Sequence, residues 1–187
     1  MEKHSLNTDA KALEEAFFAE ENRRLLAKIR ERTEKEERRA ALQGILKVED
    51  STLLDRLVDL ELSPETAVAL ALVPLVEVAW ADGSIDDKER DAILHAAEED
   101  GLEAGSTARE LLEAWLRTAP PKALLESWSV YIRDLTGQMG PDSTDLLRSR
   151  VLDRAHRVAE AAGGFLGIGQ VSAAEKRMLE ELGRAFE

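Results

Sequence analysis

The stretch LVPLVEVAWADGSIDDKERDAILHAA, residues 72–97, decides the fold. Its first half is apolar on nearly every side, which predicts a buried central helix, because a surface helix would show one polar face. That helix is expected to begin at Ser63, to kink at Pro74 and to end at Gly83 in the left-handed conformation. Asp86 is predicted to cap the next helix, and Glu89 to complete a capping box. The stretch therefore predicts a helix–turn–helix with an acidic bend.

The acidic bend also matches the second half of a calcium-binding loop. With Glu89 as the last ligand, Asp82 and Asp86 occupy later loop positions, but Val78 and Trp80 stand where the first and third ligands belong. The oxygen-bearing side chains predict a partial, weak site for a divalent cation such as calcium. Its candidate metal ligands are Asp82, Asp86 and Glu89, with Glu77 one turn earlier. The alternative is a capped turn without a ligand, since capping boxes are common.

Residues 79–89, AWADGSIDDKE, resemble the TerB-like, tellurite-resistance family, in which the pattern A-x-A-D-G-x-I-x-x-x-E recurs. The resemblance extends from about residue 53 to the C-terminus. It implies an all-helical domain with an internal pseudo-repeat, an association with stress response and metal resistance, and an acidic surface that binds cations. The family's biochemical activity is poorly defined, so the resemblance implies little mechanism.

The C-terminal part of the chain repeats this stretch in weaker form. Residues 158–163 correspond to residues 76–81, and residues 169–175 correspond to residues 83–89, so a glycine, a β-branched residue, a cap and a terminal Glu recur at the same offsets. Two helix–turn–helix units facing each other are therefore predicted. The second bend lacks the acids of the first and would add only Glu175 and Glu160 to a cation site.

Two other candidate sites are weaker. The glycines of residues 163–169 precede a helix but follow no strand and contain no Lys or Arg, so helix termination explains them better than phosphate binding. His156 and Glu160 lie four residues apart, and a solvated contact is expected there rather than metal ligation.

Composition narrows the function further. The first 50 residues hold 11 Lys and Arg against 12 Asp and Glu, so nearly all of the net charge of −13 lies on residues 51–187. The strongly negative charge of residues 51–187 repels phosphate backbones, which argues against nucleic-acid binding. The absence of cysteine excludes disulfides and thiolate chemistry. The N-terminus lacks the pattern of a signal peptide, and the longest apolar run is too short to cross a bilayer, so a cytoplasmic protein without membrane insertion is expected.

The N-terminal 49 residues are predicted to form a charged helical arm. Phe17, Phe18 and Ile29 are expected to pack on the body, while the sequence RERTEKEERR, residues 30–39, projects as a solvated helix. The alternative is a handle for a protein partner or for homo-oligomerisation, although fewer than three regular heptads are present.

Residues 50–187 are predicted to form one TerB-like all-helical domain, so the fold class is an all-α, multi-helix bundle with an internal pseudo-repeat and a charged arm. Further helices are expected after caps at Asp50 or Ser51, at Ser106, at Pro120–Pro121 and at Asp142 or Ser143, and no strand pattern occurs. The Trp and Tyr stripe of residues 124–135 is expected to belong to the core.

The functional hypothesis is a non-enzymatic stress-response domain without a cofactor, whose acidic bend binds a divalent cation weakly or docks a basic protein partner. A structural interaction module that uses the arm is the alternative. A carboxylate metallohydrolase is the least favoured hypothesis, because no activating base can be assigned.

Overall fold

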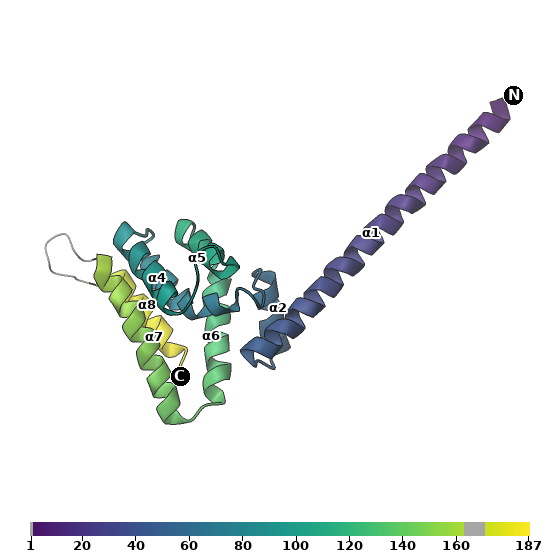
Figure 1. The fold of residues 1–187 in the computed structure, drawn as a ribbon. Coiled ribbons are helices and arrows are strands. Elements are labelled where there is room, and N and C mark those ends of the chain that lie inside the picture. Colours follow the sequence, from purple (N-terminus) through teal and green to yellow (C-terminus); the bar gives the residue numbers. More distant parts are fainter. Residues whose placement is uncertain (1, 163–170) are drawn as a thin grey trace. The chain divides into compact units, whose positions relative to one another are not determined.

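The computed structural model describes residues 2–162 and 171–187, with side chains from residue 17 onward except at residue 162. Its described residues form helices and turns without a strand, which confirms the all-α prediction (Figure 1). In chain order the elements are α1 (Glu2–Leu46), α2 (Ser51–Asp59), the 3-10 helix η1 (Ala67–Leu72), α3 (Val73–Ala79), α4 (Asp87–Glu99), α5 (Thr107–Arg117), α6 (Lys122–Gly137), α7 (Pro141–Ala162) and α8 (Ala173–Arg184). Within the described part of the chain, no helix is long and apolar enough to span a membrane.

The chain divides into two compact units, Met1–Ala40 and Ala41–Glu187. The last turn of α1 contributes Leu42 and Leu46 to the core of the second unit, and Val48 follows them into it. Lys47 ends the helix with a φ of 56°, in the left-handed region. The second unit, called the body below, therefore begins inside α1.

The central helix of the body is α3, as the sequence predicts. Its apolar side chains are buried, and it contacts η1, α4, α6, α7 and α8. The helices of the first predicted repeat, α3 and α4, contact each other, as do those of the second, α7 and α8. The two pairs also contact each other, because α7 packs against both α3 and α4. The two helix–turn–helix units therefore pack into one core (Figure 1).

The expected kink at Pro74 is wrong. Ser63 and Thr66 form a turn in which the Ser63 N–H donates to Thr66 Oγ1 at 2.8 Å, and η1 follows as a 3-10 helix. Pro74 then stands in the first turn of α3, where its missing N–H costs no helical hydrogen bond. Pro74 thus helps to start the buried α-helix instead of bending one.

Two other predicted helix ends lie elsewhere. Helix α3 ends at Ala79, four residues before Gly83, which adopts a φ of 97° in the turn that follows. Helix α7 begins at Pro141, so neither Asp142 nor Ser143 caps it; both lie within its first turn. Proline at a first helical position again explains the earlier start.

The apolar side chains of the arm belong to the first unit, and their expected packing on the body stays a prediction. Phe17, Phe18 and Ile29 are each more than half exposed, as are Leu25 and Leu26. Ion pairs such as Arg32–Glu36, at 2.9 Å, support the helix from its polar side, as predicted for this arm.

Candidate functional site

The first bend is held by hydrogen bonds of its own residues. The Gly83 N–H donates to the Trp80 carbonyl at 2.9 Å, and the positive φ of Gly83 turns the chain. Asp82 Oδ1 accepts from the Ser84 N–H at 3.0 Å and from its hydroxyl at 3.3 Å. The Asp82 side chain therefore stabilises the turn locally, in the manner of an Asx-turn.

The predicted capping box follows directly and is confirmed. Asp86 Oδ1 accepts from the Glu89 N–H, and Glu89 Oε2 accepts from the Asp86 N–H, both at 2.8 Å. Two donors at the start of α4 are satisfied in this way. Asp86 is exposed, whereas Glu89 is only 4% exposed, so the box carries one carboxylate into the protein.

A second capping box stands at the start of α8. Ser172 Oγ accepts from the Glu175 N–H at 3.1 Å, and the Glu175 carboxylate accepts from the Ser172 N–H. Glu175 is as buried as Glu89. The predicted repetition of the box is therefore confirmed, while the glycine-rich segment and the loop half of the repeat, residues 163–170, lie outside the described residues.

The two boxes come close enough for their carboxylates to interact. Burial raises the pKa of Glu89 to about 7, the hydrogen bond from the Asp86 N–H opposes this, and the negative charges of Asp86, Glu175 and Asp82 raise the pKa further. We call these four residues the acid cluster. Because its members come from both bends, the acid cluster is a product of the tertiary fold.

Glu77, the fourth predicted ligand, lies on α3 and faces α8. Burial raises its pKa to about 7, and the charge of Glu181 adds to the effect. Its Oε1 atom is buried and has no hydrogen-bond partner among the described residues. An unpartnered buried carboxylate oxygen is unfavourable, so Glu77 adds to the electrostatic strain between α3 and α8.

The acid cluster offers oxygen atoms, which suit hard cations such as calcium or magnesium. Across the described ranges, no three His, Asp or Glu side chains gather closely enough to hold a metal ion. Glu160 is exposed and meets His156 at 3.4 Å between Oε1 and Nδ1, the solvated contact that the sequence predicts. Metal ligation by Asp82, Asp86, Glu89 and Glu77 stays a prediction.

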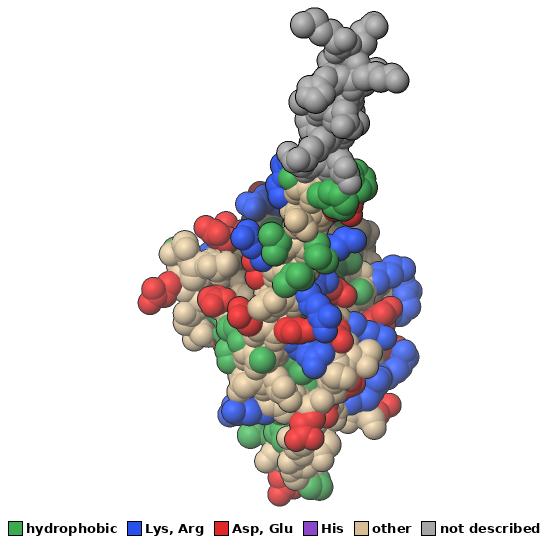
Figure 2. Space-filling view, turned by 90° about the vertical axis from the view of Figure 1, so that its right-hand side faces the viewer, with side chains coloured by type: hydrophobic (Ala, Val, Ile, Leu, Met, Phe, Trp, Pro, Cys, Tyr) green, Lys and Arg blue, Asp and Glu red, His purple; other side chains and the backbone are tan. Residues whose placement is uncertain are grey.

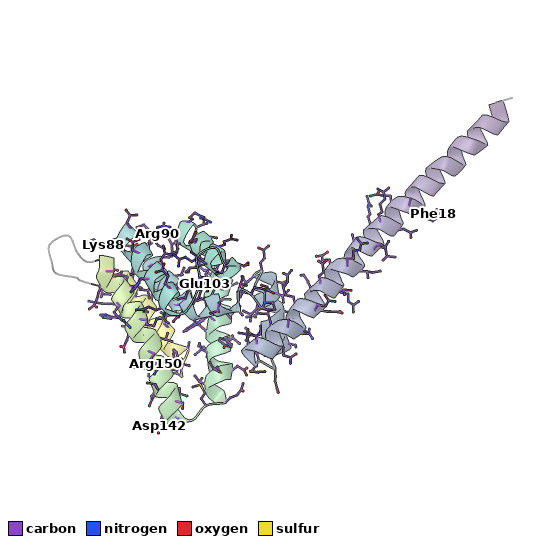
Figure 3. The ribbon with its side chains drawn as sticks, in the orientation of Figure 1. Phe18, Lys88, Arg90, Glu103, Asp142 and Arg150 are labelled. Carbon is purple, nitrogen blue, oxygen red and sulfur yellow. The ribbon has the colours of Figure 1, made fainter. Side chains whose placement is uncertain are left out.

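Contacts with α5 fix the position of the bend. The Trp80 indole N–H donates to the Trp115 carbonyl at 2.8 Å, and the Arg90 guanidinium donates to the Leu116 carbonyl at 3.0 Å. Figure 3 marks Arg90 and Lys88 on α4, beside the bend. Because the Arg90 guanidinium donates to a carbonyl at the end of α5, it links α4 to α5.

The sequence did not single out Arg109, which is a buried cation. Its guanidinium donates to the Leu94 carbonyl at 3.3 Å and to Glu113 Oε1 at 3.1 Å, and it lies 3.6 Å from Glu98 Oε1. Arg109 thus joins α4 to α5. The sequence signal for this residue was the Arg109–Glu113 spacing of four residues, which brings opposite charges together on a helix.

Comparison with known proteins gives no match, either to a family model, to a curated protein or to a solved structure. The TerB-like resemblance of residues 79–89 is therefore still a prediction from the sequence.

Proposed function

We propose that the chain is a non-enzymatic, TerB-like helical domain of a stress-response system, and that its acid cluster binds a cationic group. One observation carries the proposal: the fold brings the carboxylates of both bends together, and a buried member of the cluster, Glu89, has its pKa raised to about 7. A cation placed among these carboxylates would relieve their repulsion and the cost of burial.

The hydrogen bonds leave room for such a ligand. Asp82 and Asp86 are exposed, and each uses only Oδ1 in the bonds that hold the bend. Since three side chains are not gathered as a chelating set among the described residues, the cation is expected to be held weakly and with much of its water. The same geometry also suits a Lys or Arg side chain of a partner, which needs one or two carboxylates.

The test measures thermal unfolding of chelator-stripped protein with millimolar calcium, magnesium, manganese or zinc. An ion at ten times its Kd stabilises by about 1.4 kcal/mol, which raises Tm by roughly 3–5 °C at this size. The Asp82→Asn, Asp86→Asn double variant should lose this shift and keep the fold, because Asn also serves as an N-cap. A Glu126→Gln, Asp145→Asn variant removes two exposed charges from α6 and α7 and should behave as the wild type.

Each other outcome has a defined meaning. Saturable binding of hexa-arginine without any ion shift, lost in the double Asn variant, would assign the acid cluster to a basic protein partner. Unfolding of the double variant would show that Asp82 and Asp86 are structural. If the protein shows no ion-induced shift in Tm and does not bind the peptide, the proposal is contradicted. The bend is then only a capped turn.

A second candidate function is association through the arm, favoured by the exposed apolar side chains of α1. Phe18 and Leu25 lie seven residues apart on one helix face, the spacing of a coiled-coil seam. Sedimentation equilibrium of the full chain should then show a dimer or larger species, and Phe18→Glu with Leu25→Glu should return it to monomer. Thr33→Glu, elsewhere on the arm, is the control. A monomeric wild type would refute this candidate.

A further inference from the structure

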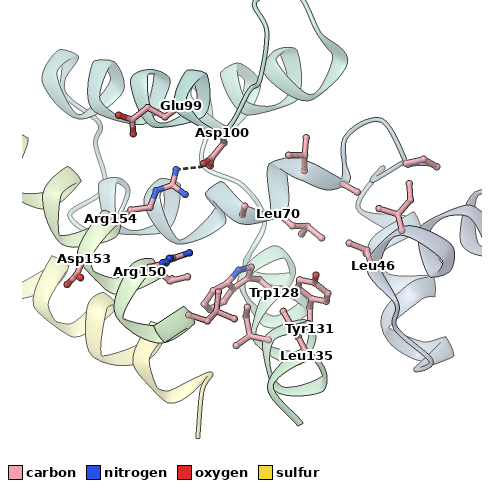
Figure 4. A pocket seen from close by; sticks show the side chains of 18 of the residues that line it. Leu46, Leu70, Glu99, Asp100, Trp128, Tyr131, Leu135, Arg150, Asp153 and Arg154 are labelled. Atoms are coloured by element: carbon pink, nitrogen blue, oxygen red, sulfur yellow. Dashed lines mark hydrogen bonds and ion pairs between the residues drawn. The ribbon is translucent and has the colours of Figure 1, made fainter. Parts of the chain in front are cut away.

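A groove of about 800 Å³ lies on the body, away from the acid cluster in sequence and sharing no residue with it. Its walls come from the end of α1, from η1 and from helices α6 and α7 (Figure 4). The volume falls within the range of sites that bind small molecules. The body therefore contains a second place at which a ligand could be held.

The floor of the groove is apolar and well packed. Trp128, Ile132 and Leu70 are almost completely buried at its base. The apolar surface continues to the rim, where Ile45 is 53% exposed and Val68 45% exposed. These large aliphatic side chains are about half exposed to water next to a concave apolar floor. Covering them with an apolar ligand would bury this surface and lower the free energy.

The polar lining is balanced in charge, with three arginines and three acids. Arg154 is neutralised, because its guanidinium donates to Asp100 Oδ2 at 2.7 Å and to the Ala96 carbonyl at 3.3 Å. Asp153 accepts from the Ser149 hydroxyl at 3.1 Å. The three arginines and three acids of the lining therefore balance, although the whole chain carries a net charge of −13. Acidic and basic side chains are also interspersed on the face drawn in Figure 2.

Arg150 differs from the other groups of the lining. Its side chain makes no hydrogen bond or ion pair with any described residue, and Figure 4 shows it reaching from α7 toward Trp128, while Asp153 points to the other side of the helix. A guanidinium presents paired N–H donors that match a carboxylate. The groove thus combines one unpaired cationic head with an apolar floor.

We propose that this groove binds a small anionic amphiphile, with its apolar chain along Trp128 and Ile132 and its carboxylate on the Arg150 guanidinium. A single negative charge fits this lining best. A protein segment with several acids would meet the repulsion of a strongly acidic body, whereas one carboxylate bound by one arginine adds little to it. An apolar molecule without a head group would leave Arg150 unpaired at the edge of the bound ligand.

The test titrates decanoate into the full-length protein and follows the indole N–H signals by NMR. The chain has three Trp residues. The Trp128 signal should shift saturably, while the Trp80 signal, fixed by its bond to the Trp115 carbonyl, should stay in place. Arg150→Gln should weaken decanoate binding about tenfold, the loss of one charge-assisted contact, and should leave the binding of decanol unchanged.

Two variants serve as controls. Arg148→Gln removes an exposed charge from the same helix outside the groove and should bind decanoate as the wild type does. Ala71→Trp fills the groove from an exposed position of η1 and should abolish the binding of both decanoate and decanol.

Three results would overturn the proposal. The first is the absence of a saturable shift at Trp128, and the second is equal decanoate affinity in the wild type and Arg150→Gln. The third is binding of an acidic amphipathic peptide at Trp128 in place of decanoate, which would assign the groove to a protein partner. None of them bears on the acid cluster, because the cation experiments use other residues.

Discussion

Helices α4 and α8 start in the same way but in different electrostatic surroundings. Each begins with a capping box whose glutamate is buried, Glu89 in the first and Glu175 in the second. The first cap is the charged Asp86, with Asp82 nearby, whereas the second cap is the neutral Ser172. The backbone donors are satisfied equally well in both, so the additional acids of the first bend are not needed to begin a helix.

This difference separates two roles of the acids in the first bend, namely capping the helix and adding negative charge near Glu89. The hydroxyl of Ser172 accomplishes the capping that the Asp86 carboxylate accomplishes, with comparable expected stability. What the carboxylates of Asp82 and Asp86 add is negative charge next to Glu89, and this charge helps to raise the pKa of Glu89. A protein that keeps such unfavourable charge is expected to use it, and cation binding is the use that we propose.

The largest expected effect that tests this comparison is on pH dependence. Because the pKa of Glu89 is raised from 4.5 to about 7 in the folded protein, the native state binds more protons than the unfolded state between these pH values. The free energy of unfolding should therefore fall as pH rises from 4.5 to 7, by about 2–3 kcal/mol from Glu89. A pKa rise from 4.5 to about 7 at roughly 1.4 kcal/mol per tenfold change in proton affinity gives about 3.5 kcal/mol in full, and part of that is lost outside this pH interval. Urea unfolding at a series of pH values measures it.

Glutamate-to-glutamine variants test which bend causes the slope of the unfolding free energy against pH. Glu89→Gln should be more stable than the wild type at pH 8, because Gln still accepts from the Asp86 N–H, and it should reduce the slope to the part that the buried Glu77 contributes. Glu175→Gln is the matched change in the second box and should have a smaller effect, through the loss of one negative neighbour. An unchanged slope in Glu89→Gln would show that the acid cluster is not under repulsion.

A smaller effect is expected when the two caps are exchanged. Asp86→Ser should match or exceed the wild-type stability at pH 8, and Ser172→Asp should reduce it by about 0.5–1 kcal/mol, because Ser and Asp cap equally well and differ in charge. The attraction of Asp for the positive end of the helix dipole offsets part of this difference. High salt should reduce it further.

Chemical denaturation at pH 8 compares these variants, with Asp86→Ala and Ser172→Ala as references for a lost cap, about 1 kcal/mol each. A loss of that size in Asp86→Ser would mean that the Asp86 charge stabilises the native bend, contrary to the repulsion that we infer.

Sequence predictions were correct mainly for features that depend on residues close together in the chain. The caps at Asp86 and Ser106 and the repeated cap, Ser172, were predicted correctly, and Asp50 was one of two residues expected to cap α2, because a cap depends on three or four consecutive residues. The burial of α3 was correct as well, since an apolar run leaves no face for water. Pro74 was misplaced because proline is compatible with a kink and with a helix start, and the sequence does not distinguish them.

Some features could not be predicted from the sequence pattern. The apolar face of the arm was visible in the sequence, but its packing on the body stays a prediction, because a pattern does not identify the partner of a face. The buried Arg109 and the groove beside Arg150 were likewise not predicted. Both depend on partners from other helices, such as the Leu94 carbonyl for Arg109.

The sequence by itself determined that the chain is helical, where most of its helices begin and that the capping box occurs twice, because these features depend on side chains and backbone groups within one turn of each other. Only the tertiary structure decided which carboxylates share an acid cluster and which arginine of the groove lining makes no ion pair or hydrogen bond with the described residues. Glu89 and Glu175 interact although 86 positions separate them in the chain. Coulombic interaction and burial depend on distance in space, and that distance is set by the packing of α3, α4, α7 and α8.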